Sequence, residues 1–146
     1  SHSDLTSDYA AIPAEMKKVA SFFGKDVLLG IELSELLENM TSIRALAGDR
    51  AVLRAMHFIR ENERVRKETE ALLADDMETF LGLVKASGDS SYKYLQNVYS
   101  SADAAHQNVS LALAISEDIL GDDGTCRVHG GDHTGFCKER CSGRIP

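Results

Sequence analysis

The sequence lacks a long apolar run, and its cysteines are few and odd in number. No stretch approaches the roughly 20 apolar residues that a membrane-spanning helix needs, and the N-terminus lacks the apolar core of a secretion signal. These two absences predict a cytoplasmic protein. Three cysteines leave one thiol over even if two pair, which argues against a secreted disulfide scaffold.

An excess of positive charge is also missing. The formal net charge is −7, so the surface repels phosphate backbones and anionic lipids, and we expect neither nucleic acid nor a membrane surface as a partner. The densest basic group is interleaved with glutamates and is typical of a solvated helix face, with Glu63 and Lys67 spaced for an i,i+4 pair. Its basic residues are Arg60, Arg64, Arg66 and Lys67.

A chain of 146 residues with 43% hydrophobic and 27% charged residues has the size and composition of one ordinary globular domain. Helical periodicity dominates its first half. Ile12, Met16, Val19 and Phe23 predict a helix that ends at Gly24, and "SELLENM" predicts a second, short helix. No proline or glycine interrupts residues 49–75, which predict one long helix with Asp49 as its N-cap.

The second half continues the helical pattern, with one strand near its end. "DDMETFLGLVKAS" predicts a helix, and "GDSS" predicts a turn and a new cap before "YKYLQNVY". The segment "AHQNVSLALAISEDILG" alternates as a strand would, but its alanines and closing Gly121 favour a buried helix that is apolar nearly all round. "GTCRVHGG" predicts a short strand entering a glycine turn, so the expected fold class is mainly α.

All three cysteines and two of the histidines fall in "CRVHGGDHTGFCKERC". These side chains are zinc ligands by type, but structural sites usually pair their ligands across a dozen or so residues, and the glycines oppose a single helix face. Alternatively, Cys126 is a small buried residue and the others are exposed. The candidate ligands are Cys126, His129, His133, Cys137 and Cys141.

Five segments resemble those of galactokinases, which are small-molecule kinases of the GHMP family. "TCRVHGG" is similar to the first half of their third signature motif, and "RAMHFIRENERV", preceded by "GDRAVLRA", is similar to their signature helix. "FLGLVKASGDSSYKYLQNVYS" is similar to their helix and serine-rich turn before an aromatic helix. The opening "SHSDLTSDYAAIPAEMKKV" resembles the segment after their domain junction. The resemblance spans residues 1–131.

The resemblance implies the helical portion of a GHMP-kinase C-terminal α+β domain with an incomplete antiparallel sheet. In the intact enzyme it implies ATP, Mg²⁺ and galactose. The family's catalytic acid cluster and its glycine-serine phosphate loop have no counterpart in these residues, so we expect no catalytic residue here and an inactive fragment.

Only a few residue roles carry over from the family. Tyr9 matches the tyrosine that hydrogen-bonds the sugar, and Gly130 and Gly131 match glycines that shape the active site. The flanking Arg127 and His129 are expected to be structural. The motif helix contributes three residues to which we assign capping and polar packing: His57, Glu61 and Asn62.

The resemblance breaks off after Gly131. Asp132 stands where the family has a third glycine, and "CKERCSGRIP" has no strand pattern. We therefore expect residues 132–146 to be an aberrant, irregular tail of the kind that a frameshift produces. The missing sheet would leave apolar helix faces uncovered, so we expect them to pair in a homo-oligomer. The competing hypothesis is a self-sufficient helical interaction module with a C-terminal zinc site.

Overall fold

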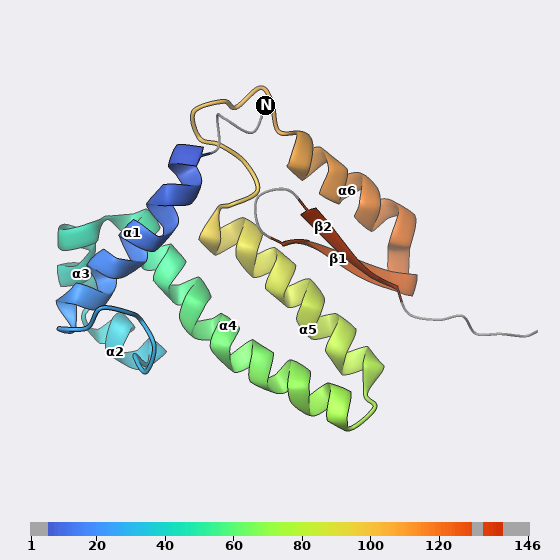
Figure 1. Cartoon of the computed structure of the whole chain (residues 1–146), viewed down its shortest axis with the longest axis horizontal. Coiled ribbons are helices and arrows are strands. Elements are labelled where there is room, and N and C mark those ends of the chain that lie inside the picture. Colours follow the sequence, from blue (N-terminus) through green and yellow to red (C-terminus); the bar gives the residue numbers. More distant parts are fainter. Residues whose placement is uncertain (1–5, 130–132, 139–146) are drawn as a thin grey trace, which may run out of the picture.

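The computed structural model describes residues 6–129 and 133–138. Its elements, labelled in Figure 1, are in chain order α1 (Thr6–Phe22), α2 (Leu33–Glu38), α3 (Met40–Ala47), α4 (Asp49–Leu73), α5 (Met77–Ser90), a π-helical turn η2 (Ser91–Leu95), α6 (Asn108–Leu120), a 3₁₀ turn η3 (Gly121–Asp123), β1 (Gly124–His129) and β2 (His133–Lys138).

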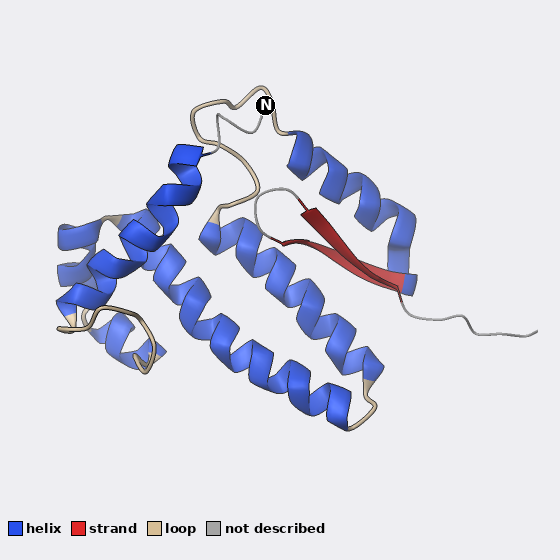
Figure 2. Ribbon diagram, viewed as in Figure 1, coloured by secondary structure: helices blue, strands red, loops and turns tan. Residues whose placement is uncertain are grey.

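The helices dominate, and the two strands form a small antiparallel hairpin at one side, as Figure 2 shows. α4 and α5 run side by side, α1 to α3 gather at the first end of α4, and β1 and α6 lie beyond α5. The predicted class, mainly α with little sheet, is confirmed. The main core lies among α1 to α4, where Val19, Leu36 and Ile43 are fully buried.

α4 confirms the predicted long helix, since no proline or glycine interrupts it and Val52 and Ala55 face the core. Its predicted N-cap is wrong. Gly48, with φ 87°, holds the cap position, and Asp49 is the first helical residue. The Asp49 carboxylate instead accepts from Arg44 Nε at 2.6 Å, and this pair lowers its pKa. Glycine fits at position 48 because a Cβ opposes positive φ.

The predicted turn at "GDSS" is also wrong. α5 begins at an Asp76 cap whose carboxylate accepts from Thr79 N at 3.0 Å, and it continues through Gly88 to Ser90 before passing into η2. Gly88 serves a contact rather than a turn, because the backbone of β1 approaches it closely. The helix ends at Gln96, which takes a left-handed conformation with φ 55°.

α6 is a helix, as predicted, but it is not buried. None of its residues is buried, and the outward side chains of Leu111, Ile115 and Ile119 are 63%, 51% and 79% exposed. Apolar residues on all sides predicted burial, yet α6 packs only its inner face on β1. None of the helices in residues 6–129 is long and apolar enough to cross a membrane.

β1 confirms the predicted strand. β2 contradicts part of the prediction that residues 132–146 are irregular, because residues 133–138 form a strand. Residues 133–138 pair with β1 in antiparallel register, with Val128 opposite Thr134 and Gly124 opposite Lys138. A strand partner satisfies the backbone groups of a segment without apolar alternation, so strand formation here depends on context more than on pattern. The rest of the predicted tail lies outside the described residues.

The predicted solvated helix face of α4 is confirmed for Arg66 and Lys67, whereas Arg64 is only 13% exposed and Arg60 is half-buried against the Tyr94 ring. Lys67 Nζ lies 3.5 Å from Glu63, and Arg66 lies 2.7 Å from Glu63 and also contacts Glu70. All four side chains are about half exposed, so these pairs contribute little stability.

Candidate functional site

Tyr9, the predicted sugar contact, lies in the first turns of α1 and is half-buried. Its hydroxyl donates to the carbonyl oxygen of Asn97 at 3.2 Å, across 88 residues of sequence. The next contact along is from the Ser100 hydroxyl to the Asp8 carboxylate at 2.6 Å. These two bonds fasten the loop after η2 to the start of α1, and a small hollow lies between them.

A charge cluster around the buried Arg54 contacts the end of η2, just before this loop, and we call it the Glu15 cluster: Glu15, Arg50 and Arg54. Arg54 is 1% exposed, and its Nε donates to Leu95 O at 3.0 Å. Its Nη1 donates to Glu15 at 2.8 Å, and Arg50 donates to the same carboxylate. Burial lowers the pKa of Arg54 and the Glu15 charge opposes this shift. The carbonyl of Leu95, the last residue of η2, is therefore held by a cation that is paired with Glu15.

A second cluster joins β1 to α4 and α5, and we call it the Glu61 cluster: Glu61, Arg64, Ser87 and Arg127. Arg127 of the glycine motif donates to Glu61 at 3.2 Å and also contacts Ser87 Oγ. Ser87 donates in turn to Glu61, whose second oxygen accepts from Arg64. Burial lowers the pKa of both arginines, while the Glu68 carboxylate opposes the shift.

His57 lies beside this cluster and is 6% exposed. Its Nδ1 is 2.9 Å from Ser90 Oγ on α5. Burial, with the charges of Arg64 and Arg127, lowers its pKa to about 4, so the ring is neutral near pH 7. His57 and Glu61 thus provide the predicted polar packing between helices, whereas Asn62 is exposed.

α5 and β1 touch at Gly88. A Cβ added there would lie 3.1 Å from Arg127 Cβ and 3.3 Å from the carbonyl oxygen of Cys126. The glycine therefore permits the close approach that lets Arg127 reach Ser87. The serine-rich "ASGDSS" segment is the seam between this helix and the strand, with Ser87 and Ser90 both buried.

The predicted active-site glycines, Gly130 and Gly131, lie outside the described residues, and their role stays a prediction. Strand β1 leads into them at His129. The described part of the motif reaches the C-terminal half of α5 through Arg127, and Tyr9 reaches the loop after η2 through Asn97. Arg127 and Tyr9, both named by the resemblance, thus contact neighbouring stretches of the chain: α5 and the loop that follows η2.

The candidate zinc ligands are not supported as a cluster. The register pairs Cys126 with Phe136 and Cys137 with Thr125, so these two cysteines are not opposite each other. Cys126 is a free, buried thiol whose pKa is raised by burial, which opposes the thiolate that zinc needs. Among the side chains that the structure describes, no group of three suitable ligands occurs. Cys141 and the side chains of His129, His133 and Cys137 lie outside what the structure describes.

Sequence reasoning missed the Glu15 cluster and the part of Ser87. Arg54 is the first residue of the motif in α4. It occupies a position where the helical pattern calls for an apolar residue, and this is the one signal in the sequence that the arginine is buried and needs a partner. Glu15 stands 35 residues from Arg50 and 39 from Arg54, so only the packing of α1 on α4 brings them together.

No family model matches the chain. Over 134 residues the chain is 27% identical to the galactokinases of Actinobacillus pleuropneumoniae serotype 5b and Glaesserella parasuis serovar 5, and 25% identical to that of Haemophilus influenzae. Each match covers 92% of this chain and 33% of the relative, so the chain spans about a third of the curated relatives that it matches. The resemblance to the galactokinases that the motifs predict is therefore confirmed over most of the chain.

Proposed function

We propose that the chain is the C-terminal part of a sugar kinase that transfers the γ-phosphoryl group of ATP, with Mg²⁺, to the 1-hydroxyl of galactose. The observation that carries the proposal is the similarity to galactokinases over 134 residues, which covers 92% of this chain. Galactose and ATP are the substrates of the intact enzyme in this proposal, and no role of this chain in nucleic acid or membrane binding is proposed.

The chain by itself is proposed to be inactive. Phosphoryl transfer depends on positioning the two substrates and on cations and backbone dipoles that stabilise the transferring group. The family's phosphate loop and catalytic acids are not among these 146 residues. In a coupled assay for ADP release, the purified chain is expected to show no galactose-dependent turnover. Robust turnover by this chain alone contradicts the inactivity, and it would leave the sugar kinase assignment standing.

Tyr9 is proposed to hydrogen-bond the sugar in the intact enzyme. Its hydroxyl donates to Asn97 O, which holds the ring at the start of α1 beside the loop after η2. In an intact kinase that carries this segment, Tyr9→Phe is expected to raise KM for galactose roughly five-fold, the loss of about 1 kcal/mol for one hydrogen bond. Tyr99→Phe is the matched control, because Tyr99 lines the same hollow.

We propose that the galactokinase-like sequence ends close to Gly131 and that the tail after it is read from a shifted frame. Gly130 and Gly131 would then be the surviving part of a glycine turn that lets backbone approach the active site closely. The coding DNA tests this directly. Read in another frame after residue 131, it should encode a third glycine and then an apolar strand. If neither alternative frame does so, the frameshift proposal is wrong.

A further inference from the structure

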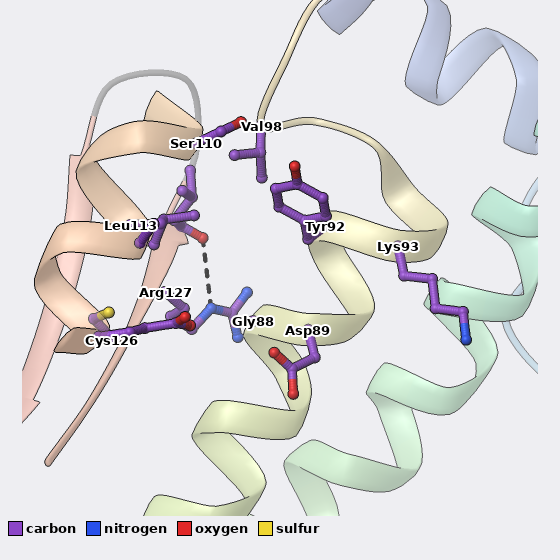
Figure 3. Close-up of a pocket in the computed structure, with 12 residues that line it drawn as sticks. Gly88, Asp89, Tyr92, Lys93, Val98, Ser110, Leu113, Cys126 and Arg127 are labelled. Carbon is purple, nitrogen blue, oxygen red and sulfur yellow. Dashed lines mark hydrogen bonds between the residues drawn. The ribbon is translucent and has the colours of Figure 1, made fainter. Parts of the chain in front are cut away.

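A cavity of about 430 Å³ opens between α5, η2, α6 and β1. Its size falls within the range of small-molecule sites in proteins. Figure 3 shows Leu113 and Ser110 of α6 on one side of it, and Asp89 of α5 and Tyr92 of η2 on the other. Among the described residues, the cavity shares no lining residue with the hollow beside Tyr9.

The floor of the cavity is apolar. Val98, Cys126 and Val128 are each at most 4% exposed, and they belong to the loop after η2 and to β1. Burial is the largest influence on the Cys126 thiol and raises its pKa, whereas Glu117 and Lys85 act on this pKa in opposite senses. An apolar body that enters the cavity therefore removes apolar surface from water.

An aromatic ring stands at the edge of the cavity. Tyr92 is 42% exposed, and its ring centroid lies 5.7 Å from that of Tyr99. Leu113 of α6 lies across the cavity from Tyr92, and Ala114 also lines it. A flat ring system between these side chains would contact an aromatic ring on one side and aliphatic groups on the other.

The charged side chains that line the cavity are balanced among the described residues. Two are carboxylates and two are cations, and the four are Asp89, Glu117, Lys93 and Arg127. All except Arg127 are exposed, so water and salt screen them. An ionised ligand would therefore lose hydration without meeting a net opposite charge, and the cavity favours an uncharged one.

One polar group at the cavity lacks a partner. The hydroxyl oxygen of Ser110 is buried and makes no hydrogen bond to any residue that the structure describes. Ser116 on the same helix differs, because its hydroxyl donates to Ala112 O at 2.7 Å. An unsatisfied buried hydroxyl costs about 1–3 kcal/mol. Rotation about the one heavy-atom torsion of serine can turn the Ser110 hydroxyl toward a ligand that accepts its proton.

We propose that this cavity binds a neutral aromatic molecule that carries one hydrogen-bond acceptor. Its ring lies between Tyr92 and Leu113 above Val98, and its acceptor receives the hydrogen bond of the Ser110 hydroxyl. Apolar walls with a few placed polar groups are the usual composition of small-molecule sites. The inference is independent of the proposed kinase function.

The probe is acetophenone, a neutral ketone, titrated into the full chain and followed by backbone amide NMR shifts. Two ions of nearly the same flat shape, benzoate and benzamidine, are titrated alongside. We expect acetophenone to shift the amides of Val98, Leu113 and Val128 and to bind about five-fold more tightly than either ion, because both ions lose hydration at a site without net charge. Missing shifts at these amides, or an ion that binds as tightly as the ketone, overturn the proposal.

Ser110→Ala separates the hydrogen bond from the apolar contacts. α-Methylstyrene has the shape of acetophenone without its acceptor oxygen. We expect Ser110→Ala to weaken acetophenone binding about five-fold, the loss of about 1 kcal/mol for one hydrogen bond, and to leave α-methylstyrene binding unchanged. Ser116→Ala is the matched control, because Ser116 is on the same helix and does not line the cavity. Equal effects of Ser110→Ala on both probes overturn the proposal.

A second pair of variants tests the place of binding. Ala114→Leu adds bulk at the cavity and is expected to remove the shifts that acetophenone causes. Ala112→Leu, on the same helix but not at the cavity, is expected to keep them. Both alanines are exposed, so neither change removes a core contact. Binding that survives Ala114→Leu places the ligand elsewhere and overturns the proposal.

Discussion

The helices α1 to α4 and the helix α6 bury their apolar residues to very different extents. In the first region Val19, Leu36 and Ile43 are fully buried, and each lies on a helix with one apolar face. In the second, α6 has apolar residues on two faces and buries none of them. A helix with one apolar face is thus buried along that face where several helices pack together. A helix with two apolar faces stays exposed where the described residues cover only one side of it.

The largest expected effect comes from removing a core side chain in the first region. Leu36→Ala is expected to lower the free energy of unfolding by about 3 kcal/mol, because the fully buried site cannot collapse around the cavity left behind. Leu111→Ala on α6, where the side chain is 63% exposed, is expected to cost less than about 0.5 kcal/mol. Urea unfolding measures both, and similar costs would contradict the comparison.

Arg54→Met tests the Glu15 cluster that joins the first region to the loop after η2. The change leaves Leu95 O without its donor and Glu15 with Arg50 alone, so we expect a loss of about 2 kcal/mol. Arg66→Met removes a pair that is more than half exposed and is expected to cost less than about 0.5 kcal/mol. Denaturant unfolding distinguishes the two, and an unchanged Arg54→Met midpoint would show that the cluster contributes nothing.

Two glycines of α5 test how closely β1 packs against this helix. Gly82 has open space around it, so Gly82→Ala is expected to stabilise the protein by about 1 kcal/mol through helix propensity. At Gly88 the same methyl meets Arg127 Cβ and the Cys126 carbonyl, and we expect the gain to be cancelled or reversed. Thermal melts of the two variants provide the measurement. Equal stabilisation would mean that β1 gives way easily.

The pH dependence of stability reports on His57 of α4, whose ring contacts Ser90 of α5. Its pKa is about 4 in the folded chain and about 6.5 in an unfolded one, so the unfolded chain binds more protons between these values. This contribution is complete above pH 6.5 and is lost as the pH falls toward 4. His57→Gln keeps a partner for Ser90, and its stability should fall less steeply over that window. Parallel pH profiles would rule out a buried neutral ring.

The smallest effect is expected on the outward face of α6. Ile119→Gln replaces a side chain that is 79% exposed, and we expect a change within about 0.5 kcal/mol. The same change tests the predicted homo-oligomer, because pairing through Leu111, Ile115 and Ile119 would make the sedimentation coefficient fall on substitution. A monomer before and after the change would reject pairing through this face.

The sequence predicted the helices well wherever one residue type decided the outcome. The uninterrupted stretch of α4 and the glycine stop after α1 are local properties of the chain. Gly88 and Ser87 misled the prediction, because glycine and serine favour turns and also occur where a helix meets a close neighbour. That difference depends on β1, which follows some 36 residues later in the chain.

In the candidate site, too, the sequence pointed to the residues and did not predict their contacts. Motif resemblance drew attention to Tyr9, His57, Glu61 and Arg127, and each has a long-range contact in the structure. The acceptor of Tyr9 is a backbone carbonyl and the partner of Arg54 is a glutamate on another helix, so no spacing rule predicts either contact. Strand β2 escaped prediction because its pairing, rather than its composition, determines its conformation.

The bonds from Tyr9 to Asn97 and from Ser100 to Asp8 join residues 88 and 92 positions apart, and this has a consequence for the order of folding. Closing so long a stretch of chain carries a large entropy cost, whereas α4 and α5 meet across a short turn. We therefore expect the α4–α5 hairpin to form early and the docking of α1 on the loop after η2 to come late. During synthesis, the bond from Tyr9 to Asn97 can form only after residue 97 has left the ribosome, so α1 docks after α4 and α5 have been made.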